Sequence, residues 1–298
     1  MDRMVMSSSV LSCLISAIAS PLGQNSDLDL DVLKLRACYQ LEKGVEGFYC
    51  NGSSGEGLLL TPQERRDALE AVLSVAEGRV PVITHVGALS TRDSIELAKH
   101  AADVGAEAIS LTPPIYYRYS EQEIRGHYLA VLDAADIPLI LYNIPQFTGR
   151  SLDPNDPLLD DPRVIGVKHT AHNLFELERM VTAHPEVAVI NGFDETYLAA
   201  TAAGAVGTIG TTVGIQIDRF KSVREALAKG DIVSAQKTQS EINDVINALV
   251  KVNVFPAAKW LESKLTGLPL GPCRKPFGTI DDAGAKALEP VVKALLKP

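Results

Sequence analysis

Eight short apolar runs, separated by segments with helical spacing, limit the folds open to this chain more than any other feature. The runs are continuously apolar, which is typical of strands buried on both faces of a parallel sheet. They cover Val10–Ala19, Gly47–Asn51, Val80–Val86, Ala106–Leu111, Ile137–Asn143, Val164–Lys168, Val187–Asn191 and Ala205–Gly210. Eight strands and their helices, spread over about 210 residues, predict a closed (β/α)8 TIM barrel. An open doubly wound sheet is the competing fold, but it often carries a glycine-rich turn after its first strand, which is absent here.

Several of the intervening segments have the marks of helices. Thr61-Pro62-Gln63-Glu64 and Ser120-Glu121-Gln122-Glu123 each place a hydroxyl three residues before an acid, which is the pattern of a capping box. Apolar residues recur three and four apart in Thr91–Val104 and Leu174–His184. We therefore expect helices between the strands.

The segment after the last strand predicts three more helices rather than a ninth βα unit. These helices are Ile232–Val252, Phe255–Thr266 and Asp282–Leu296, with the proline-containing loop Gly267–Gly278 before the last. We divide the chain into a short disordered extension at 1–9, a barrel at 10–230, and a C-terminal helical extension at 231–298 packed on the barrel. Packing over the barrel or a subunit contact is the expected role of this extension.

The N-terminal run has two interpretations. Arg3 precedes the apolar segment Val10–Ala19, and Ala17-Ile18-Ala19 is similar to a cleavage site, so the segment imitates a secretion signal. The alternative is a buried first strand of the barrel. No run reaches the roughly 18 apolar residues that a transmembrane helix needs.

Composition narrows the class of partner. Of 298 residues, 46% are hydrophobic and 22% are charged, which is typical of a globular protein. The net charge is −9 and no basic run is present, so we expect neither a nucleic acid nor a membrane as partner. Four widely spaced cysteines contain no CxxC pair, which indicates reduced thiols rather than disulfides or a zinc site.

Reactive side chains follow the strands at their carboxyl ends, where barrels carry their chemistry. Lys168 ends the sixth run, and burial there would lower its pKa and free an amine to attack a carbonyl. Tyr142 ends the fifth run and could shuttle protons for that amine. Each residue also has an interpretation without catalysis: Lys168 could be a lysine that extends to solvent, and Tyr142 could be a core aromatic.

The loop Gly52–Gly57 follows the second run and combines flexible backbone with two hydroxyl groups. Successive backbone amides in such a turn can bind a carboxylate, although the loop has neither the lysine of a P-loop nor a GxGxxG spacing. Glu56 could hold this loop or simply be a charge at the start of a helix.

Other polar residues near strand ends allow more than one role. Asp194 and Glu195 could act as a general acid and base, cap a helix, or accept hydrogen bonds from substrate hydroxyls. His169 and His172 have HxxH spacing without a third ligand in view, so we expect no metal.

Taken together, four motifs resemble the pyruvate-dependent class I aldolase family of dihydrodipicolinate synthase and N-acetylneuraminate lyase. They are GSSGE at 52–56, YNIP at 142–145, VKHT at 167–170 and NGFDE at 191–195, and the resemblance extends from Ile15 through CRKPFG at 273–278. In this family the first apolar segment is a barrel strand, which favours the strand interpretation and a cytoplasmic location. The resemblance also implies a homotetramer and no metal or organic cofactor.

Residue roles carry over from the family at matching positions. The resemblance implies that Lys168 forms a Schiff base with pyruvate or a sugar-acid ketone, and that Tyr142 handles the proton of the reacting hydroxyl. It assigns Ser53 and Ser54 to the pyruvate carboxylate and places Ser53 among the catalytic residues as well. It assigns Tyr116, reaching from a neighbouring subunit, to the proton relay. It assigns contacts with the sugar chain to Thr170, Gly192, Asp194, Glu195 and Thr211.

Fewer residues indicate which branch of the family the chain resembles. The synthases carry an arginine five residues after the YNxP tyrosine, where this chain has Phe147, while NGFDE and CRKPFG resemble the lyases. The expected reaction is therefore the reversible cleavage of N-acetylneuraminate, a sialic acid, to N-acetylmannosamine and pyruvate. Ser54 stands where threonine is common in the family, and Thr211 stands where serine is common. The alternatives are dihydrodipicolinate synthase, another 2-keto-acid aldolase, a metal-dependent aldolase, or a sugar-acid-binding regulator without activity.

Overall fold

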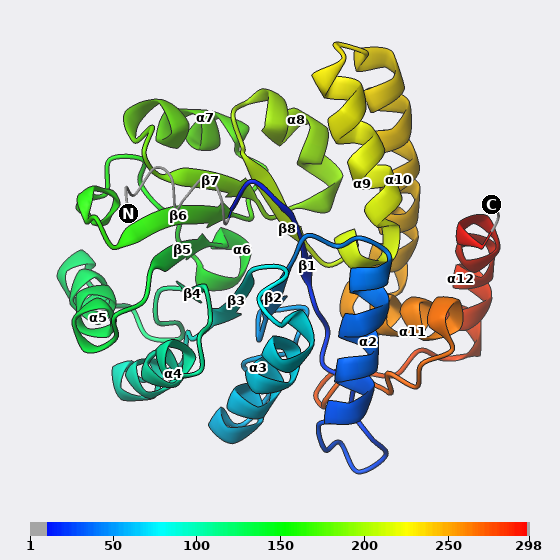
Figure 1. Ribbon diagram of the computed structural model, residues 1–298, viewed down its shortest axis with the longest axis horizontal. Coiled ribbons are helices and arrows are strands. Elements are labelled where there is room, and N and C mark those ends of the chain that lie inside the picture. Colours follow the sequence, from blue (N-terminus) through cyan, green and yellow to red (C-terminus); the bar gives the residue numbers. More distant parts are fainter. Residues whose placement is uncertain (1–10, 297–298) are drawn as a thin grey trace.

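The computed structural model describes residues 11–296, and its centre is a closed barrel of eight parallel strands in chain order, β1 to β8 (Figure 1). The strands are β1 Leu14–Ala17, β2 Gly47–Cys50, β3 Val82–His85, β4 Ala108–Leu111, β5 Leu139–Asn143, β6 Val164–His169, β7 Ala188–Asn191 and β8 Gly207–Gly210. The barrel closes because β1 pairs in parallel with both β2 and β8. The predicted (β/α)8 barrel is confirmed.

Helices follow the strands and surround the barrel. They are α2 Leu30–Glu42, α3 Pro62–Ala76, α4 Thr91–Asp103, α5 Glu121–Ala134, α6 Pro145–Thr148, α7 Leu174–Ala183, α8 Tyr197–Ala202 and α9 Val213–Ala228, with 3-10 turns η1 Pro157–Asp160 and η2 Asp194–Thr196. Both predicted capping boxes are present, at Thr61 with Glu64 and at Ser120 with Glu123. Each cap satisfies backbone N–H groups that the first helical turn leaves without partners.

Side chains along each strand alternate between two apolar clusters. Ile15, Ile83 and Ile140 point into the barrel, whereas their neighbours Leu14 and Val82 pack outward against the helices. This alternation, with period two, buries both faces of every strand. It explains why the strands read as continuous apolar runs in the sequence.

The predicted strands are longer than the observed ones. The first was expected at Val10–Ala19, but Val10 lies outside the described residues and the hydrogen-bonded strand is only Leu14–Ala17. Leu11 is instead buried in the interior cluster beneath the strands. Ile137 and Val187, predicted as strand residues, lie in the outer core ahead of their strands. Apolar residues mark the buried part of the chain, and this part extends beyond the residues that form the hydrogen bonds between strands. The extension predicted at residues 1–9 also lies outside the described part of the chain.

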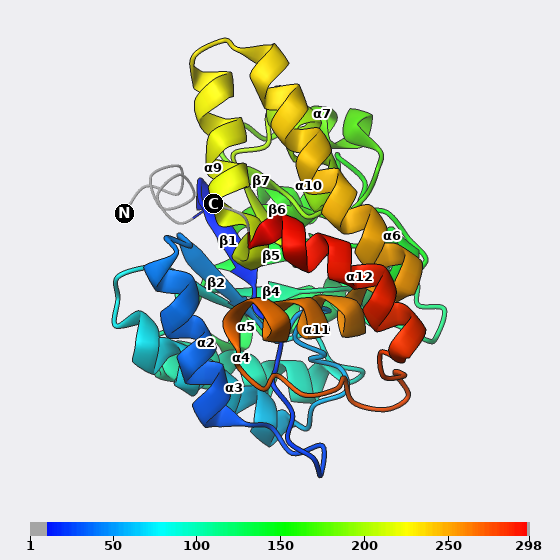
Figure 2. The ribbon, with the colours of Figure 1, turned by 90° about the vertical axis from the view of Figure 1, so that its right-hand side faces the viewer.

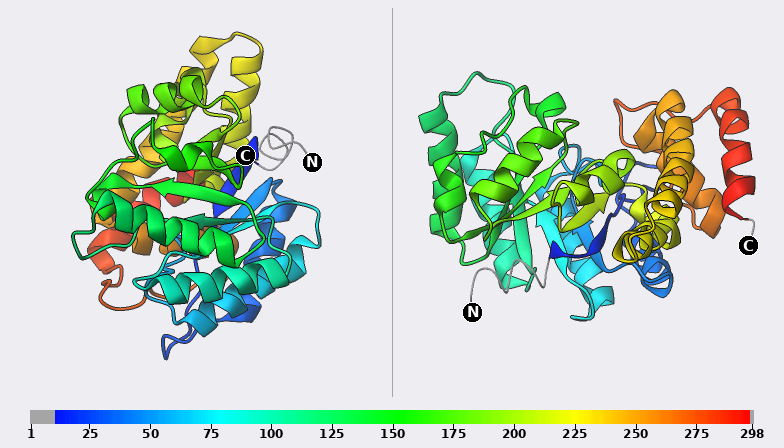
Figure 3. Two further views of the ribbon diagram at one scale, coloured as in Figure 1. Left: turned by 90° about the vertical axis from the view of Figure 1, so that its left-hand side faces the viewer. Right: turned by 90° about the horizontal axis from the view of Figure 1, so that it is seen from above.

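Three C-terminal helices gather on one side of the molecule, which faces the viewer in Figure 2 and lies opposite α4 and α5 in Figure 1 and in the right panel of Figure 3. They are α10 Ile232–Val252, α11 Val254–Thr266 and α12 Asp282–Leu295. Their own apolar cluster includes Leu249, Leu261 and Leu288. Within residues 11–296, no helix combines the length and the apolar character needed to cross a membrane.

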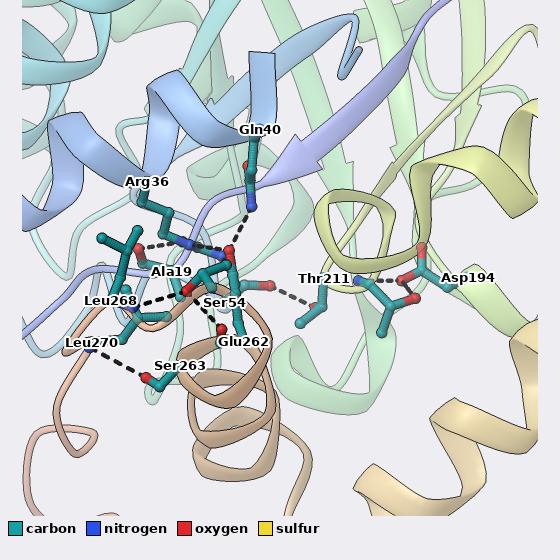
Figure 4. Close-up of polar contacts among 12 residues, drawn as sticks. Ala19, Arg36, Gln40, Ser54, Asp194, Thr211, Glu262, Ser263, Leu268 and Leu270 are labelled. Carbon is teal, nitrogen blue, oxygen red and sulfur yellow. Dashed lines mark hydrogen bonds and ion pairs between the residues drawn. The ribbon is translucent and has the colours of Figure 1, made fainter. Parts of the chain in front are cut away.

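Two buried ion pairs connect α11 with the barrel. Arg36 of α2 donates to Glu262 through Nε at 2.6 Å and also through Nη2, and Gln40 donates to the same carboxylate at 2.9 Å (Figure 4). Lys259 donates to Glu56 at 2.9 Å. The extension is therefore fixed to the barrel by charged groups that have lost their water.

Candidate active site

Lys168 points into the mouth of the barrel because of an irregularity in β6. Ile165 is part of the interior cluster, so simple alternation would turn Val167 inward and Lys168 outward. The register between β5 and β6 shifts at Leu139/Ile140, and Val167 lies in the outer cluster. A bulge of this kind reverses the alternation, which brings Lys168 inward beside its strand neighbour Tyr142.

The amine of Lys168 is enclosed by aromatic rings. Its Nζ lies 4.0 Å from the ring centroid of Tyr49 and 4.2 Å from that of Tyr142, and the residue is only 3% exposed. Burial lowers the pKa of Lys168, while Tyr142 and the more distant Asp194 act in the opposite direction. A buried amine with a lowered pKa is a better nucleophile than an exposed lysine.

The loop after β2 is shaped by two residues in the left-handed region. Asn51 has φ 60° and Glu56 has φ 55°, and the Asn51 amide donates to Thr84 at 3.0 Å. The backbone N–H groups of Ser53 and Ser54 donate to no described residue, so they are free to bind an anion. The hydroxyl of Ser54 is paired with that of Thr211 at 2.7 Å, which connects the loop to the end of β8 (Figure 4).

Asp194 is buried at the start of η2. Its Oδ2 accepts from the backbone N and the hydroxyl of Thr212, both at 2.7 Å (Figure 4). Its Oδ1 has no hydrogen-bond partner in the described chain, nor has Oγ1 of Thr170. Burial raises the pKa of Asp194 to about 6, although the bonds from Thr212 oppose the rise. Two buried polar atoms at one cavity without partners indicate a site for a hydroxylated ligand.

Two glycines are required by these contacts. A Cβ at Gly192 would lie 1.9 Å from Oγ1 of Thr170, and one at Gly210 would lie 1.5 Å from Oδ1 of Asp194. Any side chain at either position would displace the polar atom beside it. This explains why the predicted contact residue Gly192 has no side chain.

The raised pKa of Asp194 predicts a pH-dependent stability. A carboxyl whose pKa is about 6 in the folded protein, against its ordinary value of 3.8, favours folding while it is protonated, and this contribution is lost as pH rises from about 4 to above 6. The shift corresponds to about 3 kcal/mol. We expect Asp194→Asn to lack this loss, so the variant should gain stability relative to the wild type over that range. Urea unfolding at several pH values measures it; a difference that does not change with pH would contradict the pKa.

One cavity of about 170 Å³ brings the predicted residues together, and residues from the ends of six strands meet there. It is lined by Ser53, Ser54, Tyr142, Lys168, Thr170, Gly192, Asp194, Glu195 and Thr211, which are all the predicted site residues except one. The exception is Tyr116, which has a left-handed φ of 84° and is 88% exposed at the surface. A second cavity, of about 290 Å³, adjoins the first and shares Ser53, Tyr142 and Phe147.

Several residues of the site were not predicted. The sequence predicts Tyr49, whose ring faces Lys168, only as part of a strand, although its inward position follows from the alternation in β2. The C-terminal helices also line the cavity, through Ile246, Val250, Val254 and Phe255. No local signal marks these four residues, because only the packing of α10 and α11 over the barrel brings them there.

The HxxH pair does not converge. His169 is buried in β6 and lies 3.0 Å from the Asn143 amide and 3.1 Å from the backbone oxygen of Asn173, whereas His172 stacks on Phe193 at 4.5 Å. Among residues 11–296, no three His, Cys, Asp or Glu side chains are grouped to hold a metal ion. All four cysteines are free thiols.

The fold and this set of side chains define a barrel protein with its site at the carboxyl ends of the strands. The chain belongs to the dihydrodipicolinate synthetase family, whose model matches residues 10–295.

Individual relatives are similar over nearly their full length. The chain is 40% identical to the N-acetylneuraminate lyase of Rhizobium meliloti over 287 residues, which are 96% of each protein. Among solved structures, it is similar to CdNal of Clostridium difficile in complex with mannosamine, with TM-score 0.91, 28% identity, and coverage of 95% of this chain and 98% of that one. It is also similar to a catalytic lysine mutant of the Ruminococcus gnavus sialic acid aldolase, with TM-score 0.90, 30% identity, and coverage of 94% of each.

Proposed function

We propose that this protein is a class I aldolase that reversibly cleaves N-acetylneuraminate to N-acetylmannosamine and pyruvate. The observation that carries the proposal is the position of the buried Lys168 amine beside Tyr142, in the same cavity as the Ser53–Ser54 loop. A carbonyl carbon next to a carboxylate can reach the amine while the carboxylate binds the loop.

The proposed reaction passes through an imine and then an enamine on Lys168. The neutral amine of Lys168 adds to C2 of the open-chain sugar acid, and Tyr142 gives its phenol proton to the departing C2 hydroxyl, so that water leaves and a protonated imine remains beside the Tyr142 phenolate. Tyr142 takes the proton of the C4 hydroxyl, the C3–C4 bond breaks, and its electron pair moves through C2 to the imine nitrogen. N-Acetylmannosamine leaves as the aldehyde. Protonation of the enamine at C3 and addition of water release pyruvate and restore Lys168.

The remaining polar residues suit the two ends of this substrate. The amides and hydroxyls of Ser53 and Ser54 would bind the carboxylate. At the other end, the unpartnered oxygens of Thr170 and Asp194 would bind hydroxyls of the sugar chain, together with Glu195 and Thr211. The relatives support the proposed function, because one of them is a sialic acid aldolase solved as a catalytic lysine mutant and another was solved in complex with mannosamine.

The proposal includes a homotetramer in the cytoplasm. Tyr116 and Tyr117 form an exposed edge-to-face pair with centroids 5.0 Å apart, outside the cavity of their own chain. An exposed aromatic pair of this kind is suited to a subunit contact, through which Tyr116 would join the proton relay of a neighbouring site. Four free thiols are consistent with a reducing compartment.

Trapping with borohydride tests the function directly. Incubation with pyruvate and sodium borohydride should reduce the imine and leave a stable modification on Lys168, which peptide mass mapping locates. Lys259 is an internal control, because it is equally buried but is paired with Glu56. An unmodified Lys168 would overturn the mechanism. Cleavage assays with N-acetylneuraminate, beside condensation assays with pyruvate and aspartate semialdehyde, then separate the lyase from the synthase reaction.

A further inference from the structure

Helix α11 holds the Ser53–Ser54 loop through one buried lysine. Nζ of Lys259, which is 1% exposed, donates to Oε1 of Glu56 at 2.9 Å and to the backbone oxygen of Pro272 at 2.7 Å. The other carboxylate oxygen of Glu56 accepts from the backbone N of Arg274 at 2.6 Å. Glu56 therefore has both oxygens bound by the C-terminal extension.

The held carboxylate is part of the loop that carries the free amides. The backbone N of Glu56 donates to the Ser53 oxygen at 3.1 Å, and the next amide, of Gly57, donates to the Gly52 oxygen at 3.1 Å. Glu56 also has left-handed backbone geometry, which is unfavourable for a non-glycine residue unless its surroundings impose it. Loss of the Lys259 contact would release this conformation and the direction of the Ser53 and Ser54 amides with it.

Helix α10 holds the other half of the site, through two amides. Gln239 donates to the Asp194 backbone oxygen at 3.1 Å and accepts from the Leu198 amide at 2.9 Å. It also donates to Oδ1 of Asn243 at 2.8 Å, and Asn243 in turn donates to the Glu195 backbone oxygen at 3.2 Å. Together these bonds bind η2 and the start of α8 to α10.

The two sets of contacts are separate in the fold. Lys259 lies on α11 and reaches the loop after β2, whereas Gln239 and Asn243 lie on α10 and reach the turn after β7. None of the three lines the cavity with Lys168. Each therefore acts on the site only through the loop that it holds.

We propose that the C-terminal extension positions the two halves of the substrate independently, with Lys259 setting the carboxylate-binding loop and Gln239 with Asn243 setting the sugar-binding turn. This inference rests on the proposed function and names its positioning residues. The extension is thus more than a cover of the barrel, because two of its three helices, α10 and α11, position different parts of one substrate.

Two measurements report separately on the binding of the two halves of the substrate. The concentration of pyruvate that gives half-maximal borohydride trapping reports the carboxylate side alone, since no sugar is present. The KM for N-acetylmannosamine at saturating pyruvate reports the sugar side. We expect Lys259→Met to raise the first value about tenfold and leave the second within about twofold, and Gln239→Met to do the reverse, because each change removes buried hydrogen bonds from one loop. Each variant is the matched control of the other.

Additional variants separate positioning from folding. Lys259→Arg keeps the charge and should restore most of the pyruvate affinity that Lys259→Met loses. Glu56→Gln should weaken the binding of pyruvate and leave the KM for N-acetylmannosamine unchanged. If Lys259→Met does not fold, these two variants and Gln239→Met decide the question. Asn243→Ala should affect the sugar side alone.

The outcomes distinguish this inference from the proposed function. Wild-type protein that neither traps pyruvate nor forms N-acetylneuraminate would overturn the function. Wild-type protein that does both, with variants that change both values equally or change neither, would overturn the independent positioning and leave the function intact.

Discussion

Lys168→Ala is expected to abolish turnover, with a fall in kcat of about 10⁴-fold or more, the scale on which removal of a covalent nucleophile acts. Among residues 11–296, no other lysine lines the cavity, and the buried Lys259 is bound to Glu56. Steady-state cleavage of N-acetylneuraminate measures the loss, and the absence of a borohydride-trapped pyruvate adduct should accompany it.

A second variant shows that the loss is chemical. Lys168→Met keeps an unbranched side chain between the Tyr49 and Tyr142 rings but removes an amine that is expensive to bury. We therefore expect it to fold with at least wild-type stability while it is as inactive as the alanine variant. Activity of either variant within tenfold of the wild type would contradict Schiff-base catalysis by Lys168.

Arg36→Met is expected to cost about 3–5 kcal/mol of unfolding free energy, the largest stability effect that we predict. The variant leaves the carboxylate of Glu262, which is 3% exposed, without its charged partner and keeps only the donor of Gln40. It also frees the Ala19 backbone oxygen, which Arg36 binds at 2.5 Å. Urea or thermal unfolding followed by circular dichroism measures the change.

Two control variants separate the effect of the lost charge from the effect of the changed shape. The double variant Arg36→Met/Glu262→Met removes both charges together and should recover most of the loss, because no unpaired ion stays buried. Arg92→Met breaks the ion pair of an 88% exposed side chain with Asp93 and should leave stability unchanged. A loss in the double variant as large as in Arg36→Met would show that shape, rather than charge, holds α2 against α11.

The fold was predictable because its signals are local. The strands are apolar on both faces, and the helices after Thr61 and Ser120 begin with capping boxes that the structure contains. The ends of the strands were less predictable: Val10–Ala19 contains a strand of only Leu14–Ala17. Hydrophobicity records which residues are buried, whereas a strand boundary depends on a neighbouring chain to pair with.

The site was predictable where strand topology alone brings residues together. Carboxyl ends of parallel strands meet at one rim, so Lys168, Tyr142 and the loop after β2 were expected in one place, and they line one cavity. Tyr49 was missed although it obeys the same alternation. The contacts of Gln239 with Asp194 and of Lys259 with Glu56 could not be predicted, since each joins residues more than 40 positions apart.

The sequence by itself determined that this chain closes into an eight-stranded barrel and which polar residues follow its strands, because the spacing of apolar residues, the capping boxes and the strand ends are properties of neighbouring residues. Only the tertiary structure decided that Lys168 points inward, since the register shift between β5 and β6 reverses the alternation that starts at Ile165. Only the tertiary structure also decided that α10 and α11 form a wall of the cavity. Both depend on packing between distant segments, which leaves no mark on any one stretch of sequence.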